Sequence, residues 1–186
     1  MMTTIITSKS RRDGRLVAPD FNRGYIVADI ITQMANSYHQ IYIQAVFAVK
    51  YRAAVIGEAW QHELFTVIGN LINETGCQTI IVNGVADHVH CFFGLRPSVA
   101  LSDVMKIAKA KSTKWLNESR LLPERFEWQE GYGAFSYSQS HRDKVRRYIQ
   151  KQAEHHRQET FADEYRKLLN RFEVLYDERY IFEELV

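Results

Sequence analysis

One stretch decides the fold of this chain: Ile80-Ile81-Val82-Asn83-Gly84-Val85-Ala86-Asp87-His88-Val89-His90. Its apolar run and short turn predict two strands, the second of which begins at the histidines. In a strand, side chains alternate between faces, so His88 and His90 share one face and Val89 points to the other. Two imidazoles alone cannot complete a metal site, so a metal-binding role depends on ligands elsewhere in the chain.

The sequence on either side of this stretch extends it to a four-stranded sheet. Alternating apolar residues predict strands, and apolar residues at every third or fourth position predict helices. In chain order, we expect a strand over 41–49, a helix over 58–75, strands over 77–85 and 88–95, a helix over 101–118 and a fourth strand within 126–137. The order β-α-β-β-α-β predicts the α+β class, with a ferredoxin-like (RRM-like) antiparallel sheet, helices on one face and the other face open for function.

Two more helices are predicted after the sheet, each at a capping pattern. Ser140-x-x-Asp143 marks the start of a helix over 140–157, and Thr160-x-x-Asp163 marks the start of the next one. In the first of these helices, the adjacent His155-His156 pair points in directions about 100° apart. The pair therefore cannot hold one ion together, and we expect it to be solvated, with a place for His155 beside the site as the alternative.

The helix over 140–157 also carries Tyr148 and Gln152, which lie one turn apart and project from the same side. If this helix packs over the open sheet face, the Gln152 amide oxygen can join His88 and His90 on one metal ion. Such a ligand set suits Mg²⁺ or Mn²⁺ engaged with a phosphate oxygen. Tyr148 would then lie beside the ion, where the ion and nearby lysines make its phenol a better nucleophile. A packing role for Tyr148 is the alternative.

Composition and charge favour a globular protein with a polyanionic partner. The 186 residues are 46% hydrophobic, which is enough for a packed core, and the two cysteines offer no disulfide framework. The formal net charge is +2, but residues 159–186 carry eight acids and four bases, so the rest of the chain is more strongly basic. No apolar run reaches the roughly 18 residues of a membrane span, and no secretory signal is recognisable. We therefore expect a cytoplasmic location and no membrane contact.

Two motifs together resemble a known family. The motif His88-Val89-His90, followed by Tyr148-Ile149-Gln150-Lys151-Gln152, resembles the small single-tyrosine HUH transposases of the insertion-sequence 200/605 type. The resemblance covers residues 34–182 and extends to Tyr38-His39-Gln40-Ile41-Tyr42-Ile43-Gln44, Trp128-Gln129-Glu130-Gly131-Tyr132-Gly133-Ala134-Phe135-Ser136 and Tyr176-Asp177-Glu178-Arg179-Tyr180. It implies that His88, His90 and Gln152 are the metal ligands and that Tyr148 is the catalytic nucleophile.

The resemblance also implies an activity and its partners. The expected protein is a DNA transposase that cuts and rejoins single-stranded DNA at hairpin-marked ends. The reaction passes through a 5′-phosphotyrosine, leaves a 3′ hydroxyl and uses a divalent metal, Mg²⁺ or Mn²⁺. The implied assembly is a homodimer with shared active sites, in which the tyrosine helix of one subunit completes the site of the other. The sequence leaves open whether this helix serves its own subunit or its partner.

DNA contacts are predicted on two helices. The predicted DNA-binding side chains are Lys106, Lys109 and Lys114 on the helix over 101–118, and Lys144, Arg147 and Lys151 on the tyrosine helix. Cations along a helix can follow a phosphate backbone, and each phosphate contact steepens the salt dependence of binding. The alternative is that these cations form ordinary solvated faces.

Residues 1–33 are predicted to be an N-terminal extension outside the functional domain, which would then span 34–186. They lack periodicity until 26–31, and Met34 is a possible alternative start. The opposite hypothesis is an arm that docks on the domain.

Two other functions stay open beside the transposase. One is a non-catalytic hairpin-binding module, because ferredoxin-like sheets are common platforms for nucleic acids. The other is a domesticated relative that processes repeats in the host genome.

Overall fold

A computed structural model describes residues 38–181, apart from the side chains of Arg179 and Tyr180. The predicted extension over 1–33 and the alternative start at Met34 lie outside these residues. The strands are β1 (Tyr42–Ala48), β2 (Gln78–Gly84), β3 (His88–Gly94) and β4 (Gly133–Tyr137). They form one sheet in the order β2-β3-β1-β4, and every neighbouring pair is antiparallel. This order confirms the predicted ferredoxin-like sheet and the α+β class.

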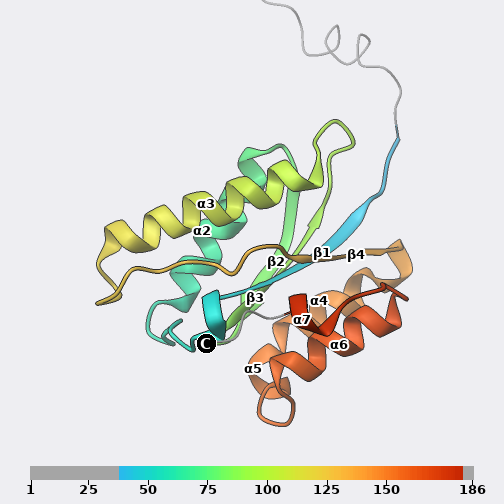
Figure 1. The fold of residues 1–186 in the computed structure, drawn as a ribbon. Coiled ribbons are helices and arrows are strands. Elements are labelled where there is room, and N and C mark those ends of the chain that lie inside the picture. Colours follow the sequence, from blue (N-terminus) through green and yellow to red (C-terminus); the bar gives the residue numbers. More distant parts are fainter. Residues whose placement is uncertain (1–37, 182–186) are drawn as a thin grey trace, which may run out of the picture. The chain divides into compact units, whose positions relative to one another are not determined.

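Two helices cover one face of the sheet, α2 (Gln61–Glu74) and α3 (Leu101–Ser119) (Figure 1). Between them and the strands lies the main apolar core, which includes Phe47, Val89 and Phe93. These strand residues follow the two-residue period expected for one buried face. The helix α2 starts three residues later than predicted and ends before Gly76, whose φ of +82° suits a glycine.

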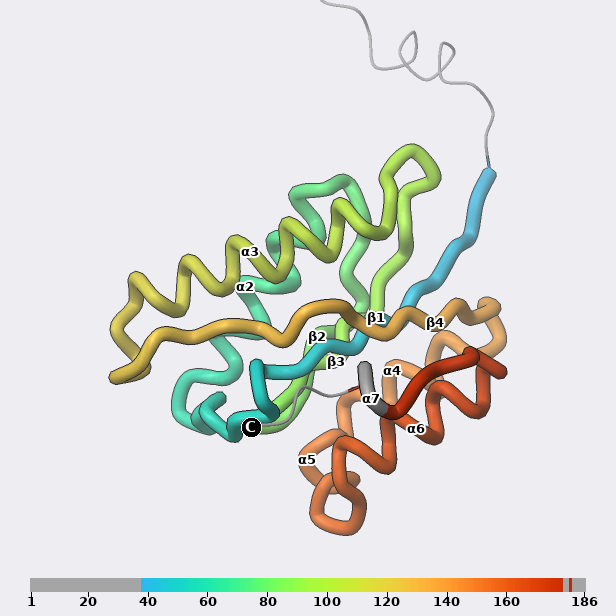
Figure 2. The backbone as a smooth tube through the Cα atoms, viewed as in Figure 1, coloured from blue at the N-terminus to red at the C-terminus, as the bar shows by residue number. Residues whose placement is uncertain are grey.

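The other face of the sheet is covered by helices from the C-terminal part of the chain. These helices are α4 (Arg142–Gln150), α5 (Gln152–His155), α6 (Phe161–Arg171) and α7 (Glu178–Ile181). Two small apolar clusters dock them: Phe92 packs with Ile149 of α4, and Phe135 packs with Leu168 of α6. In the tube view the chain turns back after α6 (Figure 2), and Ile181 of α7 belongs to the same apolar cluster as Val46 and Ala48 of β1. The predicted open face therefore holds the tyrosine helix, as expected, and two further helices beside it.

The predicted single helix over 140–157 is divided. It begins with a short 3-10 helix, Gln139–His141, and its α-helical part is interrupted at Lys151, where φ is −98° and ψ is 17°. The predicted cap at Ser140 is wrong: the residue lies inside the 3-10 turn, and its hydroxyl pairs with that of Ser138 at 2.9 Å. The cap at Thr160 is confirmed, because its hydroxyl accepts a hydrogen bond from the Asp163 N–H at 3.2 Å.

A 3-10 helix, Lys50–Arg52, follows β1, and Val49 forms an isolated bridge with Trp128. Within residues 38–181, we find no helix with the length and apolar character needed to cross a membrane.

Candidate metal centre and tyrosine site

The strand β3 presents His88 and His90 to the face covered by the C-terminal helices. Both side chains are fully buried, with ring centroids 5.0 Å apart, while Val89 lies in the core on the opposite face. A tight connection from β2 places the pair. The backbone at Gly84 approaches so closely that a Cβ there would lie 2.2 Å from the His88 carbonyl oxygen, so only glycine fits. The predicted placement of the two histidines on one face is confirmed.

Each of these rings is held through its Nδ1 atom. Asp87 Oδ1 lies 2.7 Å from Nδ1 of His88, so Asp87 orients this ring as well as forming the turn. Phe161 stacks on the other side of the His88 ring, with centroids 4.0 Å apart. On His90, Nδ1 lies 2.9 Å from Gln44 Nε2. The Nε2 atoms of both rings consequently face the C-terminal helices.

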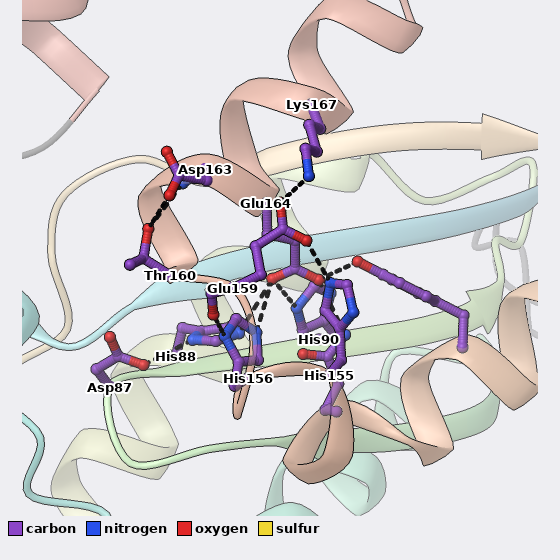
Figure 3. Close-up of polar contacts among 12 residues, drawn as sticks. Asp87, His88, His90, His155, His156, Glu159, Thr160, Asp163, Glu164 and Lys167 are labelled. Carbon is purple, nitrogen blue, oxygen red and sulfur yellow. Dashed lines mark hydrogen bonds and ion pairs between the residues drawn. The ribbon is translucent and has the colours of Figure 1, made fainter.

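Both Nε2 atoms face the carboxylate of Glu164, a residue that the sequence reasoning missed. Glu164 belongs to α6 and is only 1% exposed. Its Oε2 atom lies 3.4 Å from Nε2 of His88 and 3.3 Å from Nε2 of His90. Figure 3 shows this side chain at the centre of the polar contacts. One signal was available: an acid three residues after Phe161 and four before Leu168 falls on the apolar stripe of its helix, where a charge needs a partner.

A second residue that the sequence reasoning missed, His156, also contacts Glu164. Its Nε2 lies 3.0 Å from Glu164 Oε2, and its ring centroid lies 4.5 Å from that of His88. The neighbouring His155 turns elsewhere, with its ring 5.3 Å from that of Tyr148 and its Nε2 2.9 Å from Glu159 Oε2. The pair therefore diverges as predicted, and His155 lies beside the site, which was the alternative to solvation, whereas His156 is largely buried at the centre.

The remaining oxygen of Glu164 engages the tyrosine helix. The Tyr148 hydroxyl donates to Glu164 Oε1, and Gln152 Nε2 donates to the same atom at 2.9 Å. Tyr148 and Gln152 thus point to one spot, as their spacing predicted, in spite of the interruption at Lys151. The Tyr148 ring lies edge-on to His90, with centroids 6.2 Å apart. The structure brings all four predicted site residues, His88, His90, Tyr148 and Gln152, around Glu164.

Three buried atoms at this centre make no well-formed hydrogen bond among the described residues, although two of them lie within 3.4 Å of Glu164 Oε2. They are Nε2 of His88, Nε2 of His90 and Oε1 of Gln152. A buried polar atom without a partner is costly, and such atoms are uncommon in folded proteins. All three are atoms predicted to bind a metal ion, and a divalent cation would satisfy them. The residues present therefore fit a metal centre.

The charges at this centre shift several pKa values. Burial alone would raise the pKa of Glu164, but the surrounding imidazoles outweigh burial and hold it below the ordinary value. Burial raises the pKa of Tyr148, and the negative Glu164 acts in the same direction. For His88, Asp87 and Glu164 outweigh burial and raise the pKa, whereas burial dominates for His90 and lowers it. Without a cation, the phenol thus stays protonated against a carboxylate.

A cleft leads from the surface to Tyr148. It has a volume of about 320 Å³ and is lined by Tyr137, His141, Lys144, Val145, Tyr148, His155, Glu159, Glu164, Lys167, Leu168 and Arg171. Lys144, Lys167 and Arg171 give this cleft, which we call the basic cleft, cations beside the tyrosine and the carboxylate. An anionic chain could approach Tyr148 along them.

The six predicted DNA-binding residues fall into two groups. Lys144, Arg147 and Lys151 line a second hollow next to Tyr148. In contrast, Lys106, Lys109 and Lys114 lie on α3, which covers the sheet face opposite to the histidines. Lys109 is also engaged, because its Nζ donates to the carbonyl oxygens of Gln129 at 2.6 Å and Gly131 at 2.5 Å. The structure gathers only the first group near the tyrosine.

Comparisons with known proteins give one family match and several similar proteins. Residues 37–152 match the family described as transposase IS200 like. The ISDra2 transposase TnpA of Deinococcus radiodurans is 22% identical over 136 residues, which is 69% of this chain and 96% of that protein. A crystal structure of a transposase from Deinococcus radiodurans R1 matches 64% of this chain and 96% of its own, with a TM-score of 0.52 and 19% identity. A REP-associated tyrosine transposase bound to a REP hairpin matches 82% of this chain and 99% of its own, with a TM-score of 0.49 and 13% identity.

Proposed function

This chain belongs to the IS200-like transposase family, and from that premise we propose that it cuts and rejoins single-stranded DNA at hairpin-marked ends. In this proposal Tyr148 is the nucleophile, and His88, His90 and Gln152 hold a divalent cation, Mg²⁺ or Mn²⁺. One observation carries the proposal: the Tyr148 hydroxyl and the Nε2 atoms of His88 and His90 converge on a single buried carboxylate. A nucleophile and metal ligands within reach of one another are what phosphoryl transfer to tyrosine requires.

The reaction exchanges one phosphodiester for another. The Tyr148 oxygen attacks the phosphorus atom, the bond from phosphorus to the 3′ oxygen breaks, and that oxygen takes a proton from water to become a 3′ hydroxyl. The phenol proton passes to Glu164 Oε1, which already accepts its hydrogen bond, and from there to the hydroxide left when water protonates the 3′ oxygen, so Glu164 returns to its ionised form. Joining reverses this step, because a 3′ hydroxyl attacks the 5′-phosphotyrosine and Tyr148 recovers its proton. No external energy source is needed, since the phosphotyrosine retains the energy of the broken bond.

The protein supplies position and charge for this step. A divalent cation, when bound, would polarise the scissile phosphate as a Lewis acid. Lys144 in the basic cleft, with Arg147 and Lys151 in the adjoining hollow, would hold the flanking DNA phosphates.

Two subunit arrangements have to be distinguished, which differ in whether Tyr148 serves its own subunit or the partner. A homodimer with shared active sites is the prediction from the family resemblance. The contacts within one chain support the other form, in which Tyr148 serves its own histidines: Asn83 Nδ2 of β2 donates to the carbonyl oxygen of Ile149 on α4 at 2.8 Å. We infer that the DNA-free chain closes its site upon itself.

The direct test uses the full chain, a hairpin-bearing single-stranded oligonucleotide and Mg²⁺ or Mn²⁺. We expect a covalent protein–DNA adduct that survives denaturing electrophoresis, with Tyr148→Phe forming none. Cleavage by the wild type without any adduct would contradict the proposal. Tight hairpin binding without cleavage in either metal would point to the non-catalytic module instead.

A further inference from the structure

We propose that Glu164 and His156 are also ligands of the divalent cation, which makes the centre one of three imidazoles, one carboxylate and the Gln152 amide oxygen. This inference rests on the proposed function, because the cation is the one that serves the tyrosine reaction. Both residues follow the part of the chain that matches the family, which ends at Gln152. The centre would therefore be completed by α6 and by the residue that follows α5, beyond the part of the chain that matches the family.

The spacing of the four side chains fits a single cation. One ligand atom from each of His88, His90, His156 and Glu164 can be chosen so that all lie within 4.8 Å of one another. The three Nε2 atoms lie 3.0, 3.3 and 3.4 Å from Glu164 Oε2. Two ligand atoms about 2.1 Å from one cation lie about 3.0 Å apart at an octahedral angle and about 3.4 Å apart at a tetrahedral angle. The observed distances are thus those of neighbouring ligands.

The contacts made by the Nδ1 atoms of His156 and His88 also support metal binding by these two rings. His156 Nδ1 lies 2.9 Å from the backbone carbonyl oxygen of Glu159, which can only accept, so this Nδ1 carries a proton. His88 Nδ1 similarly faces the Asp87 carboxylate at 2.7 Å. In their neutral forms, both rings then direct an Nε2 lone pair at Glu164 Oε2. Lone pairs cannot face a carboxylate oxygen at these distances unless a proton or a metal ion lies between them.

The His90 ring can also carry its proton on Nδ1 if the neighbouring Gln44 amide turns over. Gln44 Nε2 donates to His90 Nδ1, and the Tyr137 hydroxyl donates to Gln44 Oε1 at 2.8 Å. A half-turn of the buried Gln44 amide would present its oxygen to Nδ1–H and its NH₂ group to the Tyr137 oxygen. His90 Nε2 would then be free to bind the cation, and both ends of the Gln44 amide would still have a partner.

The carboxylate would link the cation to the nucleophile. Its Oε2 faces the imidazoles, while its Oε1 accepts from Tyr148 and Gln152. Coordination through Oε2 therefore leaves the contact with the phenol in place. The donor set also bears on the choice of metal, because imidazole nitrogens favour transition ions over Mg²⁺. We infer that this centre binds Mn²⁺ more tightly than Mg²⁺.

Mn²⁺ binding to the full chain in the absence of DNA tests this inference. Electron paramagnetic resonance counts free Mn²⁺, and circular dichroism checks the fold of each variant. We expect Glu164→Gln and His156→Asn to bind Mn²⁺ at least about tenfold more weakly than the wild type. The control is Glu154→Gln, an exposed acid on α5 that pairs with Lys151, and it should bind as the wild type does. Wild-type affinity in folded Glu164→Gln would overturn the proposal.

A second readout does not depend on variants. Pulsed electron paramagnetic resonance of wild-type protein loaded with Mn²⁺ counts the coordinated imidazole nitrogens through their ¹⁴N couplings. We expect three imidazoles, and a count of two would remove His156 from the centre. A failure of this inference can be distinguished from a failure of the proposed function. If the wild type forms the adduct but coordinates Mn²⁺ through two imidazoles, and Glu164→Gln binds Mn²⁺ with wild-type affinity, then the proposed function stands and the inference is wrong.

Discussion

Tyr148 donates its hydroxyl hydrogen bond to Glu164 within the same chain, so the predicted nucleophile and the proposed metal site share one carboxylate. The contact joins α4, which lies within the part of the chain that matches the family, to α6, which lies after that part. Because Glu164 also faces three imidazoles, a change at this residue should affect both the acidity of the phenol and the binding of metal.

The first prediction concerns the acidity of Tyr148. In metal-free protein its pKa lies above the ordinary value of about 10 because of burial and the charge of Glu164. Glu164→Gln removes the charge and leaves the burial, so the pKa should fall toward 10 without reaching it. Alkaline absorbance titration of tyrosinate measures this, with Tyr148→Phe subtracted in each background. An unchanged titration would show that Glu164 does not act on the phenol.

The second prediction concerns the residue that orients His88. Asp87→Asn keeps the size of the side chain but removes the charge that pairs with Nδ1. We expect about tenfold weaker Mn²⁺ binding, as is typical when the partner of a metal-binding histidine is changed. Asp103→Asn, on α3 at the opposite face of the sheet, is the control. Equal affinities in the two variants would mean that Asp87 serves only the turn.

The third prediction separates the two groups of lysines. Lys144→Ala removes a cation from the basic cleft, whereas Lys114→Ala removes one from α3, where it pairs with Glu118 at 3.7 Å. On single-stranded DNA, each lost phosphate contact should lower the slope of log affinity against log salt by about 0.7. We expect this loss for Lys144→Ala and wild-type behaviour for Lys114→Ala. The reverse result would place the DNA on α3.

The fourth prediction concerns the subunit arrangement. His90→Ala and Tyr148→Phe each inactivate a different half of the site. If each chain closes its own site, an equal mixture of the two variants stays inactive. Shared sites in a homodimer would instead regain part of the adduct formation, because some sites would combine an intact histidine pair with an intact tyrosine. Wild type diluted with Tyr148→Phe provides the reference.

The fold and four of the six residues of the site could be predicted, because they depend on local sequence patterns. The two-residue period of apolar residues predicted the strands and placed His88 and His90 on one face. The one-turn spacing of Tyr148 and Gln152 predicted that both side chains project from the same side of their helix. Glu164 and His156 were not predicted, because their burial depends on how α6 returns across the sheet. The predicted cap at Ser140 was wrong because a 3-10 turn over Gln139–His141 precedes the helix, and the capping pattern gives no sign of this turn.

The most direct test of the central claim is the identity of the residue that becomes attached to DNA. The full chain is incubated with a hairpin-bearing single strand and Mn²⁺, the adduct is digested, and the modified peptide is sequenced by mass spectrometry. We predict a 5′-phosphotyrosine at Tyr148, with a free 3′ hydroxyl on the released strand. Attachment at another residue, or cleavage in which water rather than Tyr148 takes the phosphate, would contradict the account.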